Sequence, residues 1–122
     1  MAGQGRGWYR GDCHVHSVHS DGELTPQQLV VGARAVGLDF IATTDHNTSD
    51  AHGVWALHAD DELLVIVGEE VTTETGHWLA LGIPVGRVID WRYGVHDQVV
   101  NRYLDQVHQA GGLCVAAHPH AP

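Results

Sequence analysis

Asp12-Cys13-His14-Val15-His16-Ser17-Val18-His19-Ser20-Asp21-Gly22 is the stretch on which the interpretation of this sequence depends, because three histidines and two carboxylates fall within its first ten residues. If residues 11–16 form a strand, alternate side chains point to opposite sides, and His14 and His16 share a face with Asp12. Two imidazoles on one face can bind the same cation, and a turn at 20–22 brings Asp21 back over it. Imidazole suits Zn, Fe or Mn, and carboxylate favours the harder of these ions. The alternative is a polar surface strand with incidental histidines.

Length and charge limit the function classes. A chain of 122 residues is one domain at most and is short for a complete α/β barrel, which needs roughly 200 residues or more. The formal net charge is −9 with only six Lys and Arg, which argues against nucleic-acid binding. An anionic substrate would also be repelled unless bound metal reverses the local field.

Cysteine content and hydropathy indicate a cytoplasmic protein. Two cysteines, Cys13 and Cys114, do not form a disulfide framework, and both read as small buried apolar residues. Residues 1–10 contain no apolar run of signal-peptide length and read as an N-terminal lead-in to a metal-binding domain over 11–122. No run approaches ~18 apolar residues, so the sequence predicts no membrane span.

Hydrophobic periodicity predicts an α/β fold with the order β-α-β-(α)-β-β-α-β. The expected strands cover 11–16, 40–44, 63–68, 77–83 and 113–117, and the expected helices cover 25–36, 50–59 (a short helix or loop) and 96–110. Strands that alternate with helices imply a largely parallel sheet, whose strand C-termini share one edge.

Polar residues follow the predicted strands at their C-terminal ends, where α/β proteins build active sites. These residues are His14, His16, Asp45, His46, Glu69, Glu70 and His118. His77 instead begins its strand, which predicts either an antiparallel hairpin with the preceding strand or a loop over the site.

These motifs together resemble the PHP (polymerase and histidinol phosphatase) superfamily. The matching elements are His14-x-His16 with Ser20-Asp21-Gly22, Thr44-Asp45-His46-Asn47, Gly68-x-Glu70, His77 and Ala117-His118-Pro119. Within this superfamily, the sequence around Gly68-Glu69-Glu70-Val71-Thr72-Thr73 and Gly76-His77 is most similar to the carbaryl-hydrolase-like branch.

The resemblance implies a distorted, TIM-like (β/α) barrel of seven strands, of which about five are present, with two to three divalent ions (Mn, Fe or Zn) at its C-terminal mouth. His14, His16 and Glu70 would bind the first ion, and Asp21 and His46 the second. Glu70 would bridge to a third ion bound by His77 and His118. Asp45 would orient His46 or line the site.

Such a site predicts a metal-dependent hydrolase, with Asp21, Asp45 and Glu70 as its catalytic carboxylates. Two ions ~3.5–4 Å apart bridge a hydroxide that attacks the substrate, so no Ser or Cys nucleophile is needed. The leading hypothesis is a phosphoesterase for a small-molecule substrate. Alternatives are a carbamate, amide or ester hydrolase, a nuclease or polymerase-associated module, and an inactive metal-binding domain.

The remaining histidines have weaker expected roles. His19 and His120 are candidate substrate-binding residues, although each is more simply an exposed residue. Four others are expected on the surface or on helices: His52, His58, His96 and His108. Cys13 is expected to face away from His14 and is not a candidate nucleophile.

The sequence stops at Pro122, whereas the family pattern continues to a late Asp-x-His element. We therefore expect a truncated domain or one completed by another chain. Residues 113–117 would then form an exposed apolar edge, which predicts a homo-oligomer or poor solubility.

Overall fold

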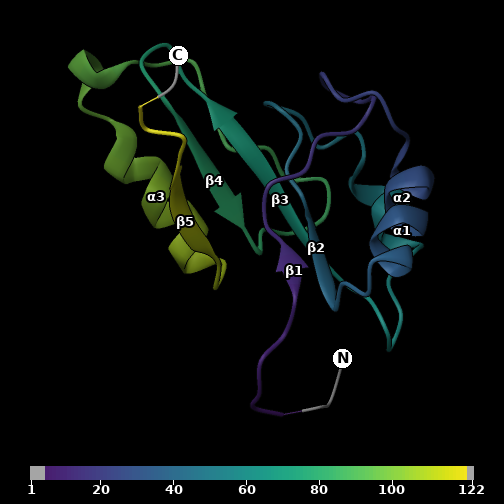
Figure 1. The fold of residues 1–122 in the computed structure, drawn as a ribbon. Coiled ribbons are helices and arrows are strands. Elements are labelled where there is room, and N and C mark those ends of the chain that lie inside the picture. The colour runs from purple at the N-terminus through teal and green to yellow at the C-terminus, as the bar shows by residue number, and fades with distance from the viewer. Residues whose placement is uncertain (1–4, 121–122) are drawn as a thin grey trace.

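The computed structural model describes residues 5–120 as one five-stranded sheet with helices (Figure 1). The strands are β1 (Gly11–Asp12), β2 (Phe40–Thr43), β3 (Leu64–Thr72), β4 (His77–Leu81) and β5 (Leu113–Ala117). The helices are α1 (Pro26–Ala35), α2 (His52–Ala56) and α3 (Val100–Gln109), with a 3₁₀ turn, η1, at Val95–Asp97. Residues 1–4 and 121–122 lie outside the described residues. The expectation of truncation depends on Pro122, which is one of them. Residues 5–10 of the predicted lead-in contain no helix or strand.

The sheet order is β1-β2-β3-β4-β5, with β1, β2 and β3 parallel and β4 antiparallel to both β3 and β5. Four strands therefore end at one edge, and β4 begins there. This confirms the predicted hairpin, and it places His77 at the same edge as the ends of the other strands. The mixed sheet is consistent with a partial α/β barrel, as predicted.

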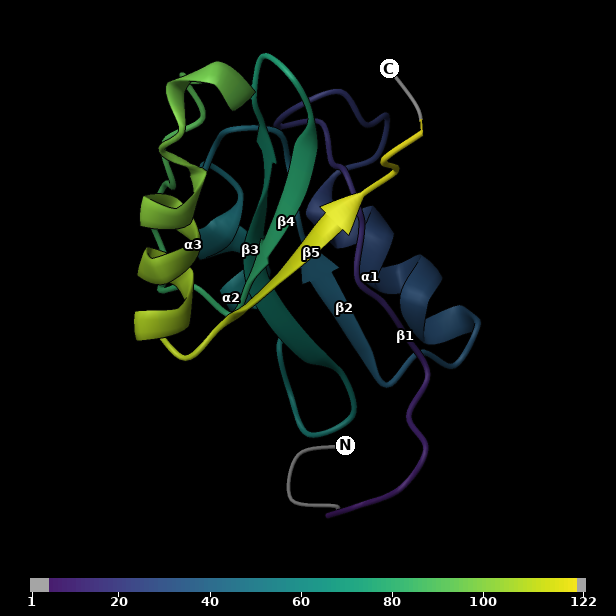
Figure 2. The same ribbon diagram turned by 90° about the vertical axis from the view of Figure 1, so that its left-hand side faces the viewer.

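The helices cover the two halves of the sheet separately (Figure 2). Thr25 caps α1 through a reciprocal capping box with Gln28, and Pro26 occupies the first turn. Val30 of α1 and Trp55 of α2 pack in one apolar cluster beside the β1–β3 half. A second cluster lies between α3 and the β4–β5 half, and its buried residues are Val71, Trp78, Ala80, Ile83, Ile89 and Val107.

Three predicted boundaries are wrong. The strand predicted over 11–16 ends at Asp12, so His14 and His16 lie on an irregular segment beyond it. The strand predicted over 63–68 continues to Thr72, because 68–72 pair with β4. The helix predicted over 96–110 is interrupted by Gln98, whose φ of 55° is left-handed, and α3 begins only at Val100.

Two predicted environments also need correction. Cys13 is exposed and Cys114 is half-buried, and Cys13 lies just past the end of the edge strand β1. His52 is buried rather than exposed, since its Nε2 donates to the Gly68 carbonyl (2.8 Å) and its Nδ1 accepts from the Gly86 amide (3.0 Å). Among the described residues, no helix has the length and apolar character needed to cross a bilayer.

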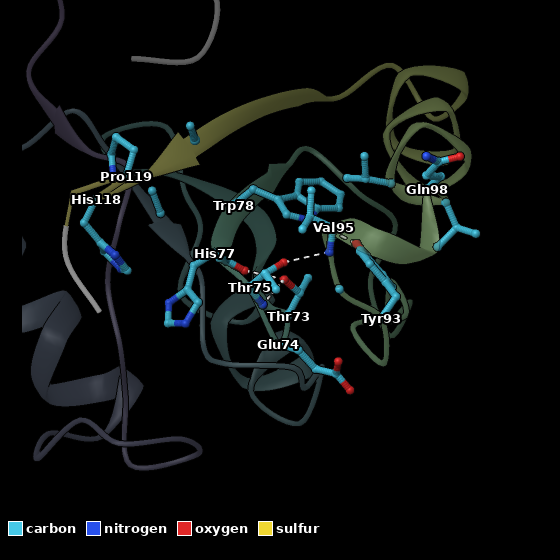
Figure 3. Close-up of a pocket in the computed structure, with 16 residues that line it drawn as sticks. Thr73, Glu74, Thr75, His77, Trp78, Tyr93, Val95, Gln98, His118 and Pro119 are labelled. Carbon is cyan, nitrogen blue, oxygen red and sulfur yellow. Dashed lines mark hydrogen bonds between the residues drawn. The ribbon is translucent and has the colours of Figure 1, made fainter.

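Exposed apolar surface occurs at the β5 edge, as predicted. Leu113 and Val115 are 67% and 44% exposed on this outermost strand. Beside the other end of β5 lies a pocket of about 670 Å³, bounded by the β3–β4 hairpin, η1 and the start of α3 (Figure 3).

Candidate metal centre

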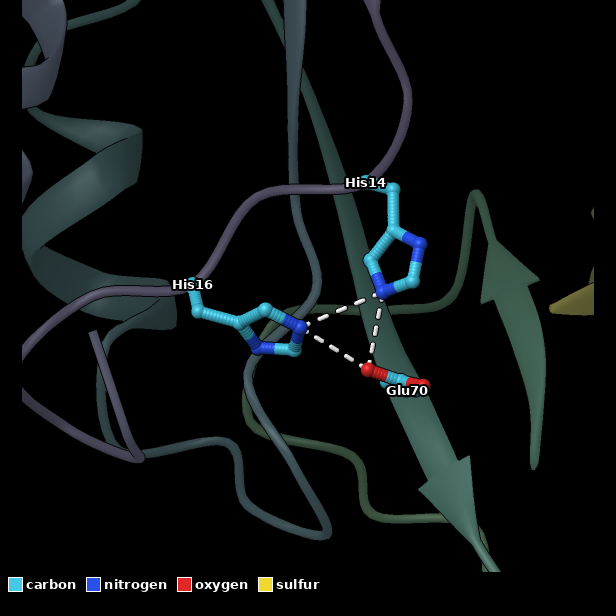
Figure 4. Close-up of side chains that lie close together, drawn as sticks. All are labelled: His14, His16 and Glu70. Atoms are coloured by element: carbon cyan, nitrogen blue, oxygen red, sulfur yellow. Dashed lines mark hydrogen bonds and ion pairs between the residues drawn. The ribbon is translucent and has the colours of Figure 1, made fainter. Parts of the chain in front are cut away.

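The buried carboxylate of Glu70 on β3 lies at the centre of the polar cluster. Its side chain is fully buried, and nitrogens of five imidazoles lie within 3.5 Å of its two oxygens. Oε1 lies 2.8 Å from His14 Nε2, 2.8 Å from His16 Nε2 and 3.5 Å from His46 Nδ1 (His14 and His16 are drawn in Figure 4). Oε2 lies 3.0 Å from His77 Nδ1 and 2.9 Å from His118 Nε2. A single carboxylate thus connects residues from β3, β4 and the segments that follow β1, β2 and β5.

Asp21 supplies a second carboxylate at the exposed side of the cluster. Its side chain is 69% exposed, and Oδ2 lies 3.2 Å from His46 Nε2. Its Oδ1 lies 3.7 Å from His16 Nδ1. All seven predicted ligands therefore line one cavity of about 440 Å³: His14, His16, Asp21, His46, Glu70, His77 and His118.

The donor set fits divalent cations. Ligand atoms fall into three groups within 4.8 Å of one another: His14-His16-Glu70, His16-Asp21-His46 and His46-Glu70-His77. The Nε2 atoms of His14 and His16 lie only 3.2 Å apart while both contact the same carboxylate oxygen. His16 Nδ1 is buried and has no hydrogen-bond partner among the described residues. Imidazole and carboxylate donors suit Zn, Mn or Fe. The first two groups contain the predicted ligands of the first two ions, whereas the third has His46 in place of the predicted His118.

The charges in the cluster match this chemistry. Burial alone would raise the pKa of Glu70, but the surrounding imidazoles, with His14 foremost, lower the pKa to about 2. Burial, together with the nearby His46, lowers the pKa of His16. Glu70 is therefore a carboxylate and His16 a neutral imidazole near neutral pH, and these are the forms that bind metal.

Asp45 holds the segment that contains the first ligands. Its carboxylate is buried, and it accepts from the Ser17 amide (2.6 Å), the Ser17 hydroxyl (2.7 Å) and the Ser20 hydroxyl (2.6 Å). Asp45 was predicted to orient His46 or to line the site, and to be one of the catalytic carboxylates. These bonds instead direct its carboxylate to the 17–20 turn, and Asp45 is not among the residues that line the cavity of the seven ligands. Asp45 thus positions His16 and Asp21, which flank this turn.

Gly22 lets the same turn close tightly. Its amide donates to the Ser17 carbonyl at 2.9 Å. A Cβ on Gly22 would lie 2.4 Å from the His16 carbonyl oxygen, so no larger residue fits without a backbone shift.

Asn47 joins the end of β2 to β3; it was part of a motif in the sequence, but no role was predicted for it. Its side-chain oxygen accepts from the Thr72 amide (2.7 Å), and its Nδ2 donates to the Thr72 carbonyl (3.2 Å). Its φ of 52° is left-handed, a conformation that Asn tolerates better than most residues. The Thr72 hydroxyl in turn hydrogen-bonds His46 Nδ1. The Asn after Asp45-His46 was the available signal for this turn.

The lesser candidates lie outside the cluster. His19 and His120 are exposed, and neither lines the cavity of the seven ligands, so their contact with substrate stays a prediction. Glu69 is fully buried on the opposite face of β3, where Oε1 accepts from the Ile89 amide at 2.7 Å. Burial raises its pKa to about 7.

Comparisons with curated proteins find distant relatives, while no protein-family model matches the chain. An uncharacterized protein of Methanocaldococcus jannaschii, MJ1587, is 25% identical over 126 residues, which cover 93% of this chain and 69% of the relative. A 5'-3' exoribonuclease of Haemophilus influenzae is 38% identical over 77 residues, which cover 61% of this chain and 26% of the relative.

Two solved structures with a similar fold are described as metal-dependent phosphoesterases or as containing one. A two-domain protein of Bacteroides vulgatus, containing a predicted PHP-like metal-dependent phosphoesterase, superposes with a TM-score of 0.67 over 87% of this chain and 34% of that one, at 24% identity. A candidate metal-dependent phosphoesterase of Bifidobacterium adolescentis has a TM-score of 0.53 at 33% identity, covering 57% of this chain and 27% of that one.

An amidohydrolase of Chromobacterium violaceum is similar at the same level. Its TM-score is 0.53 at 31% identity, covering 64% of this chain and 29% of that one. The chain thus spans about a third or less of each of these three structures. The neighbour at 24% identity shows the fold alone, and the two at 31–33% identity are described as a metal-dependent phosphoesterase and an amidohydrolase, which supports a metal-dependent hydrolase in general.

Proposed function

We propose that this chain supplies the metal-binding part of a metal-dependent hydrolase that acts as a phosphoesterase on a small-molecule substrate. The observation that supports this proposal best is the fully buried Glu70 carboxylate, shared by five imidazoles, with Asp21 opposite it. Clustered donors of this kind are costly to bury without cations, so their convergence points to bound ions.

In this proposal, some side chains would bind the ions and others would position those ligands. His14, His16 and Glu70 would bind one ion, His16, Asp21 and His46 a second, and Glu70 with His77 and His118 a third. Two or three divalent ions bound by these residues would supply a Lewis acid for the substrate oxygen and an activated water. Asp45 and Asn47 keep the ligand segments in place by their bonds to Ser17, Ser20 and Thr72. The net charge of −9 makes the ions necessary for attracting an anionic ester.

Two other activities have specific support. The amidohydrolase neighbour favours a carbamate, amide or ester substrate, because the same ions can polarise a carbonyl oxygen. The exoribonuclease relative favours a nuclease, but six Lys and Arg in 122 residues give little phosphate-backbone attraction. We rank the small-molecule phosphoesterase first on this charge argument.

Metal content and substrate choice test the proposal together. Purified protein loaded with Mn, Fe or Zn is assayed on p-nitrophenyl phosphate, a carbamate ester and single-stranded RNA. We expect metal-dependent turnover of the phosphate ester, its loss in His16→Ala, and its retention in the exposed control His96→Ala. Preferred hydrolysis of RNA or of the carbamate would replace the first activity with one of the alternatives. Absence of any metal-dependent turnover would leave a metal-binding domain without activity.

A further inference from the structure

The pocket beside the metal-binding cluster shares part of its wall with the cluster cavity. His77 and His118 line both the cluster cavity and the neighbouring pocket of about 670 Å³. Figure 3 shows these two histidines on one side and Trp78, Tyr93 and Val95 on the other. A substrate group attached to atoms at the cluster would therefore extend into this pocket, whose volume lies in the usual range for small-molecule sites, about 300–1,000 Å³.

Apolar side chains form most of its wall. Val95 and Val100 are 68% and 41% exposed although both line the pocket, so an apolar ligand there would remove their surface from water. The polar tips of the two buried aromatic residues are paired with each other, since Trp78 Nε1 donates to the Tyr93 hydroxyl at 3.1 Å. The floor consequently presents carbon surface rather than unsatisfied polar atoms.

The pocket is held open by bonds across its rim. The Glu74 amide donates to the Tyr93 carbonyl (3.1 Å), and the Val95 amide donates to Thr75 Oγ1 (2.9 Å). The Tyr93 ring also stacks on Tyr103, with centroids 4.8 Å apart and planes 5° from parallel. These contacts fix the β3–β4 hairpin against the 93–95 segment, so binding would need little ordering of the wall.

The charges in the pocket exclude an anionic ligand group. None of the described lining residues is Lys or Arg, and Glu74 contributes a carboxylate. Away from His77 and His118, which also line the cluster, a phosphate or carboxylate would thus find no cationic side chain, whereas it would find cations at a metal-loaded cluster. The two cavities therefore suit different parts of one molecule.

We propose that this pocket binds an uncharged, apolar ring or chain of the substrate while the group to be hydrolysed lies at His77 and His118. This inference rests on the proposed hydrolase function, and it identifies the substrate class as esters with a bulky apolar substituent. Specificity then resides in the residues that line the pocket, above all Trp78, Val95 and Ala116.

Calorimetric binding of two non-hydrolysable ligands to the metal-loaded protein tests the proposal. We expect phenylphosphonate to bind at least about tenfold more tightly than methylphosphonate, because the ring removes apolar surface from water. Ala116→Trp fills the pocket, and Val95→Glu adds a charge at an exposed position that tolerates it. Both are expected to reduce the preference to about twofold or less, and Ala35→Trp, exposed on α1, is the matched control.

A second measurement separates this inference from the proposed function. Acetanilide, an uncharged aryl probe, is titrated into metal-free protein while the Trp78 indole N–H resonance is followed by NMR. Movement of that resonance in the wild type, and its absence in Ala116→Trp, would support the pocket even if neither phosphonate bound. Equal phosphonate affinities in the wild type, an unchanged preference in both variants, or an unmoved Trp78 resonance would overturn it.

Discussion

Replacement of Asp45 by alanine is expected to destabilise the protein and to weaken metal binding together. The carboxylate accepts three short hydrogen bonds from Ser17 and Ser20 at 2.6–2.7 Å and is almost fully buried. Hydrogen bonds to a charged group contribute about 1.5–3 kcal/mol each, but they are not additive, and the alanine variant also leaves the buried Ser17 amide unpaired. We therefore expect a loss of about 3–5 kcal/mol in unfolding free energy.

The asparagine variant refines this expectation. Asp45→Asn keeps an oxygen that can accept from the Ser17 amide, and the Ser17 hydroxyl can rotate to accept from the new amide group. The cost should then be only about 1–2 kcal/mol. Urea denaturation of metal-free protein in a chelator measures both values, with the exposed Asp105→Asn as control.

Metal affinity connects this stability effect to the site. Loss of a group that positions metal ligands typically costs about 10–100-fold in affinity. Competition with a chromophoric chelator should show this loss for Asp45→Ala and little change for Asp105→Asn. An alanine variant that lost less than about 1 kcal/mol, or that bound metal as tightly as the wild type, would refute the role assigned to Asp45.

Three further predictions follow from the same contacts. Gly22→Ala should lower metal affinity and stability, because its Cβ would lie 2.4 Å from the His16 carbonyl oxygen, and the chelator competition measures the first effect. Burial raises the pKa of Glu69 to about 7, so its folded form keeps a proton that the unfolded chain releases near pH 4.5. Stability should therefore be favoured below pH 4.5 and fall by up to about 3 kcal/mol as pH rises through 7. Urea midpoints of Glu69→Gln should lack this fall, while those of Glu62→Gln retain it. His52→Leu should cost about 1–3 kcal/mol in urea, since it leaves the buried Gly68 carbonyl without its hydrogen bond, whereas the exposed Gly86 amide can bond to water instead.

From the sequence, the residues that converge at the site were predicted better than the hydrogen bonds and strand pairings that hold them in place. His14 and His16 converge on Glu70 as alternation required, although β1 ends before them, because an extended segment alternates whether or not it pairs. His77 was placed correctly by its position at the start of a strand. The shared face of His14 and His16 followed from residue type and spacing, whereas the grouping of all seven side chains followed from the resemblance to a known family.

The supporting contacts depend on pairings that spacing does not reveal. Glu70 lies inside β3 rather than after it, because β4 pairs with 68–72 through bonds between distant segments. His52 is buried because Trp55, one helical turn later, shares its face, a pattern visible in the sequence but outweighed by the usual exposure of His. The role of Asp45 depends on the 17–20 turn returning to it, which no local pattern specifies.

Metal stoichiometry measured by native mass spectrometry and elemental analysis tests the central claim most directly. The account predicts two or three divalent ions per chain in the wild type after loading with Mn, Fe or Zn. It also predicts loss of bound ions in Glu70→Gln, because that carboxylate is shared by all five imidazoles. A wild-type protein that binds no stoichiometric metal, or a Glu70→Gln variant that binds as many ions as the wild type, would contradict it.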